Sequence, residues 1–227
     1  EAGSLFTCGI GIDNFLYTWG KWEYSGQCFD INSNHTDIYF PKKVSVIGKV
    51  LSVSIGNGGY HCVIIGANGC VYTWGHNRVG QLGIEDNFTG KDTYILKRPT
   101  KLLFEVCSIK YALAGWGNTL LIDKQNNILI CGRNCSGQLG IHPSKCLVNN
   151  RSTPCCCSFN ILDHYNNHTE IRLTQAGVIL RSQNTSRLWG MIKETLIDND
   201  DNIHEYIEDT RNIVYCTPSL KYIIIKE

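Results

Sequence analysis

The chain has 227 residues, of which 43% are hydrophobic and 18% charged, a balance typical of a soluble globular protein and not of a disordered or fibrous one. Its formal net charge of +1 excludes a general field for holding nucleic-acid phosphates or an anionic membrane, so we expect no direct nucleic-acid binding. No run of 18 apolar residues is present, and we expect no membrane span.

Twelve cysteines and six N-x-S/T sequons are the residues that could indicate the cellular compartment of the protein. Disulfide frameworks suit small secreted domains that lack a core, whereas this chain has enough β-branched and aromatic residues to build one, so we predict reduced thiols. The sequons begin at Asn34, Asn87, Asn134, Asn150, Asn167 and Asn184. An asparagine-rich chain contains such triplets by chance. We therefore expect a cytoplasmic protein, with the nucleus as an alternative, and favour both over secretion, towards which the sequons point.

The sequence repeats itself about every 57 residues. Residues 71–84, VYTWGHNRVGQLGI, return as residues 128–141, ILICGRNCSGQLGI. An earlier copy begins at Phe15, and a degenerate later copy ends at Trp189-Gly190. The anchoring glycines are Gly20, Gly75, Gly132 and Gly190, which are 55, 57 and 58 residues apart. We place the repeats at about 4–56, 57–114, 115–174 and 175–217, with the start of a fifth at 218–227, in one segment spanning 1–227.

Short apolar runs bounded by glycine, asparagine and proline predict β-strands within each unit. In chain order, the expected strands are 15–20, 42–46, 50–54, 61–65, 69–74, 100–104, 108–112, 119–122 and 128–131. Strands 42–46 and 100–104 follow Pro41 and Pro99. Four strands per unit with a glycine-aromatic motif predict an all-β fold, a β-propeller of four-stranded blades with four repeats and the first strand of a fifth. Gly75, Gly80 and Gly83 would allow positive φ and close backbone approach.

The second unit runs from Gly58-x-x-His61 through Trp74-Gly75 to Gly80-Gln81-Leu82-Gly83. This pattern resembles the repeat of the regulator of chromosome condensation family. The third unit departs from it, with Asn118 in the place of the histidine and Cys131 in the place of the tryptophan, and Gly115-Trp116 ahead of its hairpin looks most like the secretion-regulating exchange factors. The resemblance implies a propeller, commonly of seven blades, that serves as an interaction surface or as a guanine nucleotide exchange factor for a small GTPase.

Seven blades at this period would need about 400 residues. Residues 221–225, KYIII, look like the opening strand of a fifth unit. Because an open array exposes unpaired strand edges, we expect the remainder of a longer protein, or a second chain, to cover them.

Four groups of residues suggest chemistry, but each fits a structural role better. Gly75 and Gly80 have the spacing of a phosphate loop, yet Gln81-Leu82 replaces the Lys-Ser/Thr that such a loop needs. The run Cys155-Cys156-Cys157 has no C-x-x-C partner, and adjacent strand residues point to opposite faces. His164 and His168 flank an expected loop, and His61 lacks the partners of a triad. We predict no catalytic, cofactor-binding or metal-binding residue and no cofactor.

The segment from Met191 to Asn212 carries seven acids and two bases. A solvated loop is the simpler interpretation. The sharper hypothesis is a docking loop for a basic surface, with six candidate partner-binding residues: Asp198, Asp200, Asp201, Glu205, Glu208 and Asp209.

Two hypotheses of function remain. The first is a protein-protein interaction scaffold that presents propeller loops to a protein partner, in small-GTPase regulation, as part of a larger chain or complex. The alternative is a guanine nucleotide exchange factor for a small GTPase, which needs no covalent chemistry because exchange rests on differential affinity. A hydrolase or metalloenzyme is disfavoured because repeat positions explain the polar groups.

Overall fold

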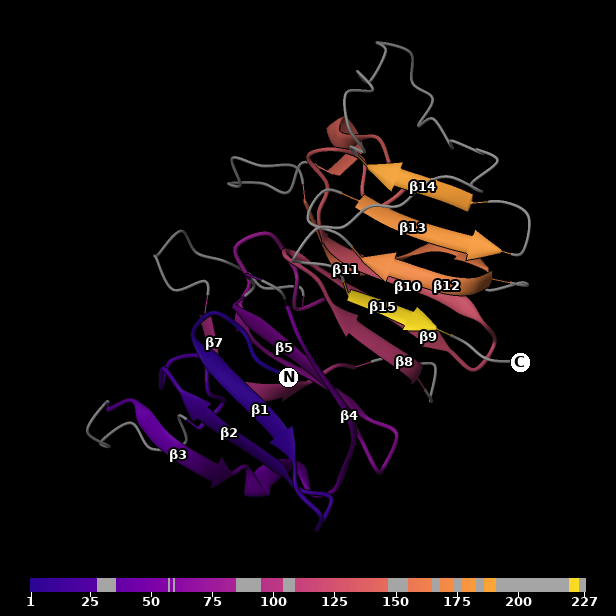
Figure 1. Cartoon of the computed structure of the whole chain (residues 1–227). Helices are drawn as coiled ribbons and strands as arrows, with labels where there is room; N and C mark the ends of the chain where they lie inside the picture. The colour runs from indigo at the N-terminus through magenta and orange to yellow at the C-terminus, as the bar shows by residue number, and fades with distance from the viewer. Residues whose placement is uncertain are drawn as a thin grey trace.

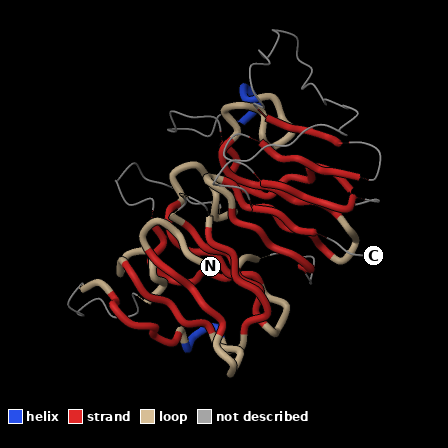
Figure 2. The backbone as a smooth tube through the Cα atoms, viewed as in Figure 1, coloured by secondary structure: helices blue, strands red, loops and turns tan. Residues whose placement is uncertain are grey.

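The computed structural model describes residues 1–27, 36–56, 58, 60–84, 95–103, 109–146, 155–164, 168–173, 177–182, 186–190 and 221–224. In this part of the chain, strands and turns predominate, with two short 3₁₀ helices, η1 (Ser45–Ile47) and η2 (Pro143–Cys146) (Figure 2). The strands are β1 (Phe6–Ile10), β2 (Leu16–Gly20), β3 (Ile38–Lys43), β4 (Val50–Ile55), β5 (His61–Gly66), β6 (Val71–His76), β7 (Ile95–Lys101), β8 (Ile109–Ala114), β9 (Asn118–Asp123), β10 (Asn127–Arg133), β11 (Cys155–His164), β12 (His168–Leu173), β13 (Gly177–Ser182), β14 (Ser186–Gly190) and β15 (Lys221–Ile224).

The strands form four antiparallel sheets. Their strand orders are β1-β2-β3, β4-β5-β6-β7, β8-β9-β10-β11 and β14-β13-β12-β15. Figure 1 shows the sheets following one another in chain order, from the indigo strands at lower left to the orange strands at upper right. Three of these sheets have four strands and the first has three in the described residues, and their succession along the chain confirms the predicted all-β blades.

The outer edge strands of the first two sheets each contain a proline. Pro41 lies within β3 and Pro99 within β7, so the prediction that these strands begin after the proline was wrong. Both strands pair on one side only, and proline, which has no N–H to donate, is tolerated at such an edge. The strand predicted to reach Val46 also ends earlier, at Lys43, and the chain turns into η1.

A glycine near the end of β6 allows the neighbouring strand β5 to approach closely. Gly75 pairs with His61 and has a φ of 99°. A Cβ built on it would overlap the carbonyl oxygen of Tyr60. The pairing of β6 with β7 shifts register between Thr73 and Gly75, as expected for a β-bulge at Trp74. The predicted role of Gly75 in close backbone approach is therefore confirmed.

The apolar core is divided into clusters that lie between neighbouring sheets. Cys62 and Ile64 of β5 pack with residues of the first sheet, such as Leu16. Val63 of β5 packs with Leu121 of the third sheet. Successive side chains on a strand point to opposite faces, so β5 is buried on both sides, which explains its continuous apolar run.

Two hydrogen-bonded joints connect the sheets. Trp74 is the largest fully buried side chain of the described residues, and its Nε1–H donates to the carbonyl oxygen of Tyr24 at 2.9 Å. Cys131 holds the corresponding place in the third sheet, and its Sγ–H points to the carbonyl oxygen of Gln81 at 3.7 Å. The hydroxyl of Thr119 donates to the same oxygen. Each joint thus ties a strand to the turn of the preceding sheet.

The first and last described strands, β1 and β15, each lie at an edge of a sheet. Lys221–Ile224 forms a strand, as predicted, but it pairs with β12 in the fourth sheet instead of opening a fifth. At the other end, Ala2 forms an isolated bridge with Thr7, and Cys8 N–H donates to Glu1 C=O.

Candidate interaction surface

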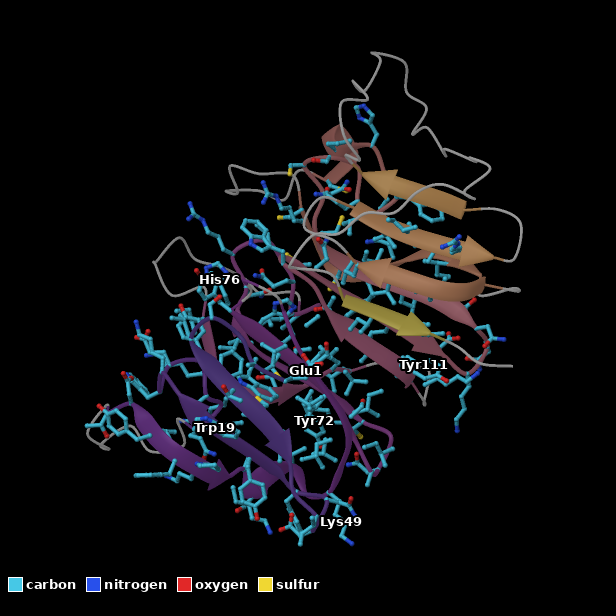
Figure 3. The ribbon with its side chains drawn as sticks, viewed as in Figure 1. Glu1, Trp19, Lys49, Tyr72, His76 and Tyr111 are labelled. Atoms are coloured by element: carbon cyan, nitrogen blue, oxygen red, sulfur yellow. The ribbon has the colours of Figure 1, made fainter. Side chains whose placement is uncertain are left out.

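Alternate loops of an antiparallel sheet emerge at the same end, so the loops after β2, β4, β6, β8 and β10 share one end of the structure. Figure 3 shows His76, the last residue of β6, at this end and Lys49, which precedes β4, at the opposite end. We call the side chains gathered there the aromatic face. Its members are Trp22, Tyr24, Tyr60, His76, Lys97, Trp116 and Arg133.

The centre of the aromatic face is a chain of three rings from two sheets. The ring centroids of Tyr24 and Tyr60 lie 5.7 Å apart with the planes tilted by 45°, and those of Tyr60 and His76 lie 6.1 Å apart. Tyr24 is buried, and its carbonyl accepts the bond from Trp74 described above. Tyr60 is 39% exposed. The exposed ring therefore rests on a buried, hydrogen-bonded base.

The third sheet contributes a cation-π pair. The guanidinium carbon of Arg133 lies 4.9 Å from the centroid of the Trp116 ring. Trp116 is 36% exposed, and it packs against Gly58 so closely that a Cβ at Gly58 would lie 3.0 Å from the indole. Glycine at position 58 is thus what lets the indole of the third sheet lie over the loop of the second.

The aromatic face is cationic. Lys97 Nζ lies 4.5 Å from the ring centroid of Trp22. In the described segments around these rings, the cationic residues are Lys21, Arg78, Lys97, Arg98 and Arg133, and the acidic ones are Glu23 and Asp37. Stacking on aromatic rings holds two of the cationic side chains in place while their charge stays available to a partner.

His76 is neutral at physiological pH. Burial lowers its pKa, and the charge of Arg78 lowers it further. Its Nδ1 accepts a bond from the Arg78 backbone N–H at 3.4 Å and faces Gln81 Nε2 at 3.2 Å. The positive charge of the face therefore comes from its lysines and arginines.

Cys135 adjoins the aromatic face and is expected to be a reactive thiol. Partial burial opposes its ionisation, but hydrogen bonds from Arg133 and Ser136 outweigh that effect and lower its pKa. Arg133 Nε donates to Cys135 Sγ at 2.8 Å. We predict that Arg133→Ala slows alkylation of Cys135 by iodoacetamide at pH 7 by about three-fold or more, measured by mass spectrometry of the Cys135 peptide. An unchanged rate would show that Arg133 does not activate this thiol.

The residues proposed from sequence as a docking loop lie elsewhere. Asp198, Asp200, Asp201, Glu205, Glu208 and Asp209 fall outside the described residues, so the docking-loop hypothesis stays a prediction. Sequence reasoning missed the aromatic face, although one signal was present. Tyr60 lies in the short loop between β4 and β5, and Trp116 lies in the corresponding loop of the next repeat, between β8 and β9.

The alternative sites proposed from sequence take structural roles. In the turn from Gly75 to Gly80, Asn77 Oδ1 accepts from Leu82 N–H at 3.0 Å, and Asn77 C=O accepts from Gly80 N–H. These amides face inward and form no phosphate cradle. Cys155-Cys156-Cys157 begins β11, as predicted for strand residues.

The described residues hold neither a metal-binding cluster nor a membrane-spanning helix. In these ranges no group of three or more His, Cys, Asp and Glu side chains is placed to hold a metal ion. None of the helices found there has the length and apolar character to cross a membrane.

Comparison with known proteins identifies the repeat. A sequence model described as the regulator of chromosome condensation (RCC1) repeat matches residues 68–122, and a second model of this repeat matches residues 50–81. The ultraviolet-B receptor UVR8 of Arabidopsis thaliana is 27% identical over 150 residues, which cover 63% of this chain and 32% of the receptor. The secretion-regulating guanine nucleotide exchange factor of Mus musculus is 29% identical over 137 residues, covering 59% of this chain and 28% of that protein. The chain therefore spans about a third of the length of these relatives.

Solved structures share the fold. Yeast RCC1 (Prp20), in its complex with Kap60, has a TM-score of 0.68 at 16% identity, covering 99% of this chain and 53% of the yeast chain. Human WBSCR16 has a TM-score of 0.60 at 16% identity, covering 90% and 50%. The repeats and the fold define an RCC1-type β-propeller. Residues 50–122 carry RCC1 repeats and the described fold is that of an RCC1 propeller, as the sequence resemblance predicted.

Proposed function

We propose that this chain is a protein-protein interaction scaffold whose partner docks on the aromatic face, in the regulation of a small GTPase. The observation that carries the proposal is the pair of partly exposed rings, Tyr60 and Trp116, each held by a neighbour that the fold positions. Tyrosine, tryptophan and arginine are the residues most enriched in binding hot spots. Rings already fixed by stacking lose little conformational entropy when a partner binds.

The charge of the face suggests the chemistry of the partner. Lys97 and Arg133 lie over indole rings, so a partner that presents carboxylates beside apolar groups would complement both parts of the surface. The small GTPase itself, or a protein that acts with one, is the partner we propose.

Replacing Trp116 by alanine is expected to weaken binding of the partner by about 30-fold or more, because a central aromatic contact contributes about 2 kcal/mol. The partner would be recovered by affinity capture with the full chain, and its Kd would then be measured for each variant. Ile12→Ala is the matched control, since Ile12 is fully exposed in the turn between β1 and β2 at the opposite end. Equal affinity of Trp116→Ala and Ile12→Ala would place the partner elsewhere.

The second candidate function is guanine nucleotide exchange. The similarity to the mouse secretion-regulating exchange factor, at 29% identity, favours it. A labelled-GDP release assay against a panel of small GTPases distinguishes the two functions. Faster release with the wild-type chain and slower release with Trp116→Ala would support exchange through the aromatic face. Binding without accelerated release supports the scaffold.

The acidic segment and the compartment remain proposals of their own. Deletion of residues 197–209 is expected to weaken binding of the partner if that partner carries a basic surface. Unchanged binding would reject the docking-loop hypothesis. We propose a cytoplasmic location, which fractionation of cells would test.

A further inference from the structure

Two cysteines meet where η2 packs against β11. The Sγ–H of Cys156 donates to Sγ of Cys146 at 3.0 Å. Cys146 is the last residue of η2 and is buried, whereas Cys156 in β11 is half-buried. A disulfide holds its sulfur atoms at about 2.05 Å, so an approach of about 1 Å separates this pair from a covalent bond.

A second donor converges on the Cys146 sulfur. Asn134 Nδ2 lies 3.2 Å from Cys146 Sγ and also donates to the carbonyl oxygen of Ile141 at 2.7 Å. The other end of the same amide is fixed, because Asn134 Oδ1 accepts from Leu139 N–H at 2.9 Å. The amide orientation therefore presents N–H, and not oxygen, to the sulfur.

The two hydrogen-bond donors give the two thiols different chemical roles. Negative charge on Cys146 would receive hydrogen bonds from both Asn134 and Cys156. Burial raises the pKa of Cys156 to about 12, and its hydrogen bond with Cys146 contributes to that rise. Cys146 is therefore the thiol placed to act as a nucleophile, and Cys156 is the thiol that keeps its proton.

We propose that Cys146 and Cys156 form a redox-active dithiol that a peroxide oxidises to a disulfide, which ties η2 to β11. Cys146 sulfur attacks one peroxide oxygen, the O–O bond breaks, and Cys146 becomes a sulfenic acid while the displaced oxygen leaves as water with the Cys146 proton. Cys156 sulfur then attacks the sulfenic sulfur, the S–O bond breaks, and a second water leaves with the Cys156 proton. Two thiols lose two electrons, and hydrogen peroxide is reduced to two waters.

The neighbouring cysteines provide competitors within the same chain. Cys155 and Cys157 flank Cys156 on β11 and point to the opposite face of the strand. Cys135 accepts a hydrogen bond from Arg133, and its pKa is lowered. If Cys146 forms a disulfide with Cys156 and with none of these three cysteines, the contact between the two sulfur atoms, and not thiol reactivity alone, decides the pairing.

Tryptic peptide mapping of the native full chain tests this pairing. The chain would be treated with hydrogen peroxide, its remaining thiols alkylated, and the protein digested. Cleavage after Lys145 and Arg151 places Cys146 in peptide 146–151 and Cys156 in peptide 152–172, while Cys135 falls in peptide 134–145. We expect a linked pair of 146–151 with 152–172, the loss of two thiols per chain, and full reversal by dithiothreitol.

Variants assign the two roles and identify the linked sulfur. Cys156→Ser is expected to stop at a Cys146 sulfenic acid that dimedone traps, and Cys146→Ser to remove both the trapped acid and the linked peptides. Cys157→Ala is the matched control and should keep the linkage. Linkage through Cys135, Cys155 or Cys157, or no linkage under conditions that oxidise Cys135, would overturn the proposal. If a variant fails to fold, fragmentation of the linked wild-type peptides between Cys155, Cys156 and Cys157 identifies the linked sulfur.

Discussion

Replacement of Trp74 by alanine is expected to lower the free energy of unfolding by about 3–5 kcal/mol. The indole is fully buried between the first and second sheets, so its removal leaves a cavity at the joint. The carbonyl of Tyr24 also loses the N–H that it accepts at 2.9 Å. Urea unfolding of the full chain, followed by circular dichroism, would measure the loss.

Two variants separate the causes of that loss. Trp74→Phe keeps a ring in the joint and removes the hydrogen bond, and we expect a cost of about 1–2 kcal/mol. Trp19 holds the same repeat position in the first sheet but is only half-buried, so Trp19→Ala should cost less than Trp74→Ala. A loss below about 1 kcal/mol for Trp74→Ala, on the scale of surface substitutions, would mean that the joint does not depend on the indole.

Acidification is expected to destabilise the fold through His61. His61 is fully buried, and its Nε2–H donates to Thr119 Oγ1 at 3.0 Å, because the Thr119 hydroxyl itself donates to the Gln81 carbonyl. In the described structure, His61 Nδ1 has no hydrogen-bond partner. Burial, and then the neighbouring His76, lower the pKa of His61 to about 3 from an ordinary value of 6.5.

The direction of the change in stability with pH depends on which state of the chain binds more protons. Between pH 6.5 and about 3 the unfolded chain binds a proton that the folded chain does not, so the free energy of unfolding falls as the pH falls. The slope reaches about 1.4 kcal/mol per pH unit, which gives a loss of roughly 3 kcal/mol between pH 6.5 and pH 4. Well above pH 6.5 both states are neutral and His61 adds no pH dependence.

A substitution that the third repeat already carries isolates this contribution. Asn118 holds the equivalent position in the third sheet and bonds to the carbonyls of Cys131 and Arg133. His61→Asn should therefore fold, and its stability should fall less steeply with acidification than that of the wild type. His76 and the carboxylates titrate in both proteins, so the difference between the two pH profiles reports His61. Parallel profiles would show that His61 does not resist protonation.

The blades were predictable because their signals are local. Glycines such as Gly75 are required by a single turn or a single strand pairing, and hairpins join residues close in sequence. Pro41 misled the prediction of β3 because only the sheet order shows that this strand lies at an edge. A proline that would end an inner strand is acceptable there.

The contacts within the aromatic face were not predictable, because they join residues of different sheets. Tyr24 and Tyr60 come from the first and second sheets, and Trp116 of the third lies against Gly58 of the second. No periodicity within one unit encodes such a contact. It depends on how closely consecutive blades pack, which in turn depends on joints such as that of Trp74 with Tyr24.

The burial of β5 on both faces separates the parts of this protein that evolution can alter from those that it cannot. A change in β5 must suit two neighbouring sheets at once, and so must a change in the turn that directly follows β6, where Leu82 is buried and its carbonyl accepts from Thr73. An exposed turn position such as Ile12 can vary without meeting this constraint. One unchanged scaffold can in this way acquire new partners through its loops.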